Sequence, residues 1–295
     1  MSYAGELSAL LTAVMWTGSA LAFAAATTRV GSVYVNVIRL AAAVVLLVAT
    51  VAVGRISIAL SFTQIGYLAA SGLVGFVFGD TFLFKSYEYN SARISTVVMS
   101  AAPAMAALLA FLLLGEKLSL LSIFGMVVTL TGITIVVMEK REESTHHVPV
   151  SMTGVLYAFL GALGQAGGLV LAKQAFVLGS INGFLATLIR ATAGTLVLAP
   201  MNYYAGRFSN PVEVFVKDRS ALHFTLLGAF LGPFLGVTFS LIAVSMTNVA
   251  IAATLMATAP LMVPVAVGVK VTCNVHFPLA ATLAPQGVVP PGVAA

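Results

Sequence analysis

The stretch that decides the fold is GFVFGDTFLFKSYEYNSARISTVVMSAAP, residues 75–103, because it returns as GPFLGVTFSLIAVSMTNVAIAATLMATAP, residues 232–260. A second repeated segment lies upstream of each copy: GELSALLTAVMWTG, from Gly5, returns as GVLYAFLGALGQAG, from Gly154. Every copy is long and apolar. Two copies of one apolar helical bundle predict a pseudo-symmetric membrane protein, and in such proteins a solute usually crosses at the interface between the repeats.

Composition indicates that lipid, rather than water, surrounds most of the chain. Hydrophobic residues make up 60% of the 295 residues and charged residues only 8%, whereas a soluble domain carries roughly 25% charged residues. The formal net charge of +5 comes from cations scattered through short polar breaks. They form no basic stripe of the kind that binds nucleic acid, so we expect no nucleic-acid partner. The single cysteine, Cys273, excludes an internal disulfide.

Nine apolar runs are long enough to cross a bilayer, which takes about 20 residues for roughly 30 Å of hydrocarbon. The runs are continuous rather than alternating, and open sheet edges cannot face lipid, so strands are excluded. We therefore predict an all-α, polytopic membrane bundle of nine to ten transmembrane helices. The predicted spans are residues 6–26, 34–53, 64–84, 93–114, 119–138, 153–173, 181–201, 221–244 and 248–269.

Two repeats and a polar linker account for the chain. Residues 1–138 form the first repeat, residues 139–152 the linker, and residues 153–295 a second repeat of four clear helices and an atypical fifth. That fifth segment, near residues 275–294, holds four prolines, and each proline removes a backbone donor and disfavours helix at the preceding residue. We expect the similarity between the repeats to end near Lys270; a natural variant, a truncation or a frameshifted reading would each produce this.

The run PAMAALLAFLLLGEKL, residues 103–118, followed by Gly125 and Gly132, resembles the end of an EamA-type five-helix unit of the drug/metabolite transporter superfamily. The second copy matches through MATAPLM, residues 256–262, and then departs. The resemblance covers roughly residues 5–270. It implies ten helices in two inverted five-helix halves around a central solute pathway.

The resemblance also implies a function: secondary-active export or exchange of metabolites, amino acids or drugs by alternating access at the repeat interface. It implies a multi-pass protein of the plasma membrane with a cytoplasmic N-terminus. The distribution of lysine and arginine predicts the reverse orientation, so orientation stays open. The expected partners are a small-molecule solute and the lipid bilayer, and a homodimer stays open.

The motifs that the sequence lacks bear on classes of protein other than transporters. The chain lacks a nucleotide-binding loop, so coupling to a gradient, exchange or uncoupled transport is expected in place of ATP-driven transport. It also lacks the motifs of metalloproteases and serine hydrolases, so we expect no enzyme and no cofactor. The adjacent His146 and His147 are typical of a solvated loop rather than a metal site. A non-transporting scaffold or receptor, a channel and an intramembrane enzyme remain as alternatives.

Two ionisable residues inside apolar spans are expected to meet. Such residues cost a few kcal/mol to insert and usually face a partner or a wet cavity. Arg39 lies near the start of the second span and Asp80 near the end of the third. Because consecutive spans are antiparallel, both residues lie at a similar depth. We predict an Arg39–Asp80 ion pair, serving either as a gate or coupling pair or as a permanent structural pair.

Arg190 is the repeat counterpart of Arg39, and we expect it to lie deeper, near the middle of the seventh span. The counterpart of Asp80 is Val237, so Arg190 lacks the equivalent acid. A deep arginine without an acid favours an anionic solute or a carboxylate ligand. Alternatively, the guanidinium of Arg190 donates hydrogen bonds to backbone carbonyls or extends to the membrane–water interface.

Trp16 and Gln165 occupy matching mid-span positions in the two repeats, which predicts that both line a pocket near the pseudo-symmetry axis. Asn36 and Asn182 complete the predicted substrate-binding set; ordinary helix packing is the alternative for all of them.

Two further repeated features concern the helices themselves. Pro103 and Pro260 match each other, and each frees a carbonyl inside a span, which predicts helix bends useful for gating. The GxxxG patterns at residues 75–79 and 232–236 predict close helix crossings.

Overall fold

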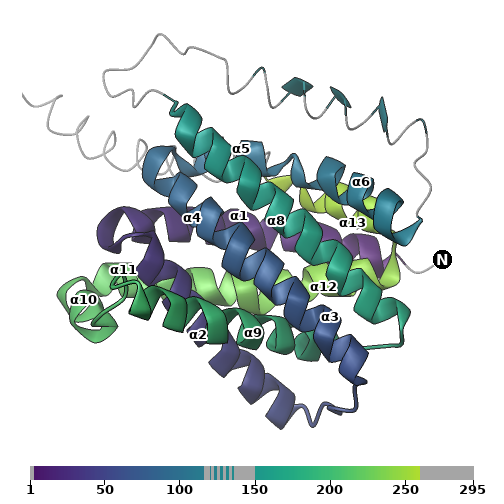
Figure 1. Ribbon diagram of the computed structural model, residues 1–295, viewed down its shortest axis with the longest axis horizontal. Coiled ribbons are helices and arrows are strands. Elements are labelled where there is room, and N and C mark those ends of the chain that lie inside the picture. Colours follow the sequence, from purple (N-terminus) through teal and green to yellow (C-terminus); the bar gives the residue numbers. More distant parts are fainter. Residues whose placement is uncertain are drawn as a thin grey trace, which may run out of the picture.

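The computed structural model describes residues 3–115 and 150–259, together with residues 120, 123–124, 127–128, 131–132 and 135 between them. Every regular element in these residues is a helix, and the helices pack into one bundle (Figure 1). Seven helical segments of the same residues are long and apolar enough to cross a membrane. The predicted all-α, polytopic membrane bundle is therefore confirmed.

The described helices follow the predicted spans. In chain order they are α1 (Ala4–Val30), α2 (Ser32–Val53), α3 (Phe62–Gly72), η1 (Leu73–Gly79), α4 (Asp80–Tyr89), α5 (Ala92–Met99), α6 (Ala102–Leu114), α8 (Met152–Val177), α9 (Gly183–Tyr204), α10 (Pro211–Lys217), α11 (Arg219–Ala229), η2 (Phe230–Gly236), α12 (Val237–Met246) and α13 (Val249–Met256). The fifth predicted span is described only at isolated residues. Pro260, the end of the ninth span and the proline-rich tail lie outside the described residues.

Matching spans of the two repeats depart from regular α-helix at matching places. The third span contains the π-helical segment η1 and the eighth contains η2, and each is continuous with the α-helices on both sides. Such π turns widen a helix locally and are frequent at functional sites. In the fourth span α5 ends at Met99 and α6 begins at Ala102; in the ninth, α13 ends at Met256, the counterpart of Met99. The two repeats therefore share their departures from regular α-helix as well as their apolar spans.

Glycines let the third span of one repeat cross the first span of the other. Segment η1 packs against α8, and η2 packs against α1. A Cβ atom on Gly164 of α8 would lie 2.4 Å from the Cα of Gly79, and one on Gly168 would lie 3.1 Å from the Cα of Gly75. Only residues without a side chain allow backbones to approach so closely. Each repeat therefore packs its third span closely against the first span of the other repeat.

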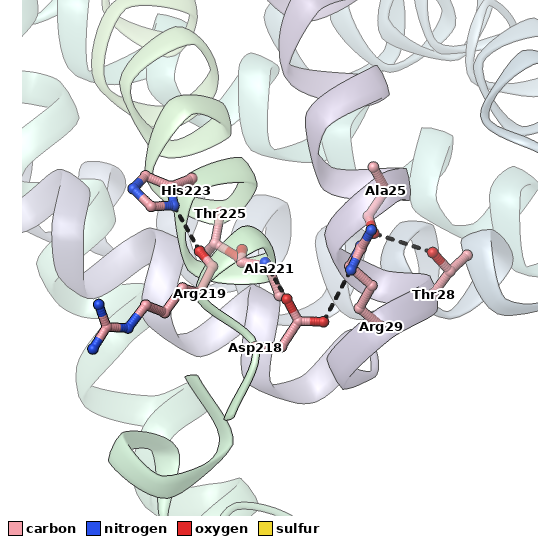
Figure 2. Close-up of polar contacts among 8 residues, drawn as sticks. All are labelled: Ala25, Thr28, Arg29, Asp218, Arg219, Ala221, His223 and Thr225. Atoms are coloured by element: carbon pink, nitrogen blue, oxygen red, sulfur yellow. Dashed lines mark hydrogen bonds and ion pairs between the residues drawn. The ribbon is translucent and has the colours of Figure 1, made fainter. Parts of the chain in front are cut away.

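Outside the membrane-spanning segments, Asp218 joins the end of α1 to the start of α11 (Figure 2). Its Oδ1 accepts a hydrogen bond from the backbone N–H of Ala221 at 2.9 Å and so caps α11. Its Oδ2 accepts one from Nη1 of Arg29 at 3.1 Å. The backbone hydrogen bond first, and then Arg29, hold the pKa of Asp218 below its ordinary value of 3.8.

The contribution of Asp218 to stability is expected to depend on pH. Because the folded protein holds its pKa below 3.8, the carboxylate stabilises the fold above that pH, and this stabilisation is lost as the pH falls through the lower, folded pKa. Asp218→Asn keeps a capping oxygen but removes the charge. We expect its melting temperature to lie below that of the wild type at pH 6 and to converge on it in acid. A difference that is unchanged down to pH 3 would contradict this assignment.

Candidate functional site

A cavity of about 150 Å³ lies between the two repeats, room for about ten water molecules or one small organic molecule. Most of its wall is apolar. Six of the residues singled out from the sequence line it: Trp16, Arg39, Asp80, Pro103, Gln165 and Arg190. Helices from both halves of the chain contribute these residues, so the cavity exists only where the repeats meet.

Arg39 is held by three kinds of contact. Its Nη2 atom donates to Oδ2 of Asp80, in an ion pair between α2 and the start of α4. Its Nε and Nη2 atoms also donate to Oδ1 of Asn36, one turn earlier on α2, at 3.0 and 2.9 Å. The guanidinium carbon lies 4.5 Å from the ring centroid of Phe84, a cation–π contact. Asn36 was predicted to bind substrate, but it is buried and is not part of the cavity wall. Its contact with the solute is indirect at most, through the position that it gives to Arg39.

Asp80 bridges the two repeats. While Oδ2 accepts from Arg39, Oδ1 accepts from Nε2 of Gln165 on α8 at 2.5 Å. Both carboxylate oxygens are therefore occupied. The sequence placed Gln165 in the pocket but gave no signal for this bond, because it depends on how η1 crosses α8. The small Gly79 beside Asp80 is what permits that crossing.

Arg190 is a buried charged residue whose guanidinium lacks acceptors among the described residues. It is 2% exposed, and its Nε and Nη1 atoms have no hydrogen-bond partner among the described residues. Its guanidinium carbon lies 5.3 Å from the ring centroid of Phe76. A Cβ atom on Gly75 would come within 3.2 Å of Nη2 of Arg190. A side chain at position 75 would therefore crowd the guanidinium, which glycine avoids.

The predicted greater depth of Arg190 is wrong. Helix α2 begins at Ser32 and α9 at Gly183, so each arginine follows the first residue of its helix by seven positions, 39 − 32 and 190 − 183. The error arose because the second span was started two residues too late and the seventh two residues too early. Asn182, which was placed inside that span, instead caps α9.

Asn182 lies outside the pocket. Its Oδ1 accepts from the backbone N–H of Phe184 at 2.9 Å, and the residue is exposed. An asparagine directly before an apolar run is a typical helix start. That signal was present in the sequence and identifies Asn182 as the N-cap of α9.

Trp16 is the counterpart in the first repeat of Gln165 in the second. It lies mid-way along α1, and its ring packs on Gly236 of η2, where a Cβ atom would come within 2.7 Å of Cδ1 of the indole.

Pro103 lies in the first turn of α6, directly after the break in the fourth span. A proline is tolerated there because the first N–H groups of a helix need no intrahelical acceptor. Its use as a gating bend stays a prediction, as does that of Pro260.

The described residues offer no group of three or more His, Cys, Asp or Glu side chains that could hold a metal ion. His146 and His147 lie outside the described residues.

The EamA-like transporter family matches the chain twice, over residues 3–138 and residues 152–269. The chain belongs to this family. Among curated proteins it is similar to the "Uncharacterized transporter YxxF" of Bacillus subtilis (strain 168), with 27% identity over 134 residues. That match spans 45% of this chain and 41% of the relative. A solved crystal structure aligns over 98% of this chain and 99% of its own, with a TM-score of 0.64 and 19% identity, a likeness that shows the fold alone.

Each EamA-like half supplies part of the cavity wall. Trp16, Arg39 and Asp80 come from the first matched range, and Gln165 and Arg190 from the second. The family match ends at residue 269, beside the point at which the sequence departs from its own repeat.

Proposed function

We propose that this EamA-like protein is a secondary-active transporter that carries a small organic solute through the cavity between its repeats by alternating access. The observation that carries the proposal is the position of the cavity. It is walled by both repeats, and matching helices meet around it: α2 packs on α9, and the third span of each repeat packs on the first span of the other. Transporters built from repeats bind their solutes at such interfaces.

The energy source follows from what the sequence lacks. Without a nucleotide-binding loop, a solute gradient, an ion gradient or exchange drives the movement. As part of the same proposal, the multi-pass bundle lies in the plasma membrane, and its partners are a small-molecule solute and lipid. The proposal includes no catalytic step.

Reconstitution into liposomes tests the proposal. Liposomes preloaded with a metabolite mixture are expected to show saturable uptake that accelerates when the same solute is present inside, because only a carrier both saturates and exchanges. A non-saturating flux would indicate a channel, and no flux of any solute would remove transport altogether. A scaffold or a receptor would then take its place.

Trp16→Ala is expected to lower the saturable uptake about tenfold, which corresponds to about 1.4 kcal/mol of lost contact between the indole and the solute. Leu163→Ala is the matched control, because Leu163 is an exposed apolar residue on α8 outside the cavity wall. Equal loss in both variants would show that Trp16 acts through general stability and does not touch the solute.

A further inference from the structure

The charges of the cavity wall do not balance. Among the described residues that line it, the charged side chains are Arg39, Asp80 and Arg190. Asp80 is engaged on both oxygens, by Arg39 and by Gln165. Its negative charge is thus balanced by Arg39 at contact distance. One positive charge, that of Arg190, is left over.

The surplus guanidinium has a specific unmet requirement. Its Nε and Nη1 atoms are buried and lack acceptors among the described residues. A buried cation without an acceptor costs several kcal/mol, and proteins seldom retain one unless a ligand supplies the missing partner. A carboxylate or sulfonate oxygen pair fits a guanidinium through two parallel hydrogen bonds.

The rest of the described wall is largely apolar and carries no further charge. Its side chains include the aromatic rings of Trp16, Phe23 and Phe84 and the thioethers of Met99 and Met256. These groups receive an apolar body and offer no anion. In the described part of the wall no second carboxylate is present to receive an ammonium group.

Resting on the transport function proposed above, we propose that the solute is an organic monoanion: one carboxylate or sulfonate, bound by Arg190, attached to a compact apolar body. The unbalanced charge and the two unpartnered nitrogens of Arg190 carry this assignment. Zwitterionic amino acids and cationic drugs are disfavoured, because their ammonium group would lie beside Arg190 without a carboxylate to neutralise it.

Three probes of nearly equal size separate the charge classes: benzoate, benzamide and benzylamine. The measurement is the melting temperature of the purified full chain in an uncharged detergent at pH 7.5, since a ligand of the folded state raises it. Benzoate is expected to raise the melting temperature with increasing concentration. Benzamide and benzylamine are expected to leave it unchanged.

Arg190→Gln is expected to weaken benzoate binding about tenfold to a hundredfold, the loss that follows removal of hydrogen bonds to a charged group. Arg190→Lys keeps the charge but not the planar fork, and is expected to bind with intermediate affinity. Arg207→Gln is the matched control, because Arg207 follows α9 at an exposed position away from the cavity. It should bind benzoate as the wild type does.

Several results would overturn the assignment. These are protection by benzylamine or benzamide equal to that by benzoate, no protection by benzoate, or undiminished protection of Arg190→Gln. If Arg190→Gln fails to fold, the three probes on the wild type decide the question alone.

Failure of the proposed function is distinguishable from failure of the charge assignment. Saturable exchange of a neutral or cationic solute without any response to benzoate keeps the transporter and removes the monoanion. Benzoate protection that depends on Arg190, with no saturable flux of any solute, keeps the anion site and removes transport.

Discussion

Arg39→Gln is expected to lower the free energy of unfolding by about 3–5 kcal/mol, because it leaves the carboxylate of Asp80 buried without its cation. Gln165 alone would then hold that carboxylate. Asn36 would also lose the donor for its Oδ1 atom. The measurement is chemical or thermal unfolding of the purified protein in detergent.

A double-mutant cycle tests whether the pair acts as a unit. Asp80→Asn leaves Arg39 as an uncompensated buried cation and is expected to cost a similar amount. Arg39→Gln and Asp80→Asn together are expected to be milder than either change alone, because neither member of the pair is then left as an unpaired charge. Losses that simply add would show that the two residues stabilise the protein independently.

The same substitution in a surface pair provides the matched control. Arg29 pairs with Asp218 at 3.1 Å, but its side chain is 47% exposed. Arg29→Gln is therefore expected to cost much less stability than Arg39→Gln, because water screens an exposed pair. Equal effects at Arg29 and Arg39 would mean that the Arg39 site is wetter than its burial implies.

Gly72→Ala is expected to destabilise the protein by about 3 kcal/mol or more, the upper range for overpacking in a tight core. A Cβ atom there would lie 2.2 Å from the carbonyl oxygen of Arg190, so the backbone of α3 or α9 must move. Because α9 carries Arg190, the variant is also expected to bind the anionic probe more weakly. Unfolding and benzoate protection measured on one preparation test both effects.

Gly66→Ala is the control on the same helix. A Cβ atom on Gly66 would have no neighbour within 4 Å. Alanine is a better helix former than glycine by about 1 kcal/mol, so the control is expected to be neutral or slightly stabilised. Equal stability of the Gly66 and Gly72 variants would contradict the close crossing of α3 and α9.

Much of the fold could be predicted from the sequence. The apolar runs predicted the described spans, and the repeated segments predicted two related halves. Arg39 and Asp80 could be placed at one depth because consecutive spans reverse direction, and the structure joins them. Hydropathy and span order are local properties of a sequence, which is why these predictions needed no knowledge of how distant helices meet.

Several contacts of the candidate site could not be predicted from the sequence. The bond from Gln165 to Asp80 joins helices of different repeats, and Asp80 directly follows the π-helical segment η1. Asn182 was misassigned because a span boundary was drawn by hydropathy alone, although its capping position was visible.

The sequence by itself determined that the chain is a duplicated bundle in lipid, and which ionisable residues lie within it. Only the tertiary structure decided which of them remains without a partner. Arg39 and Arg190 hold the same place in their helices, yet one faces Asp80 and the other no acceptor among the described residues. The physical reason is that partnership depends on which helix faces lie together once the repeats dock, and that docking is set by backbone contacts at glycines far apart in the chain.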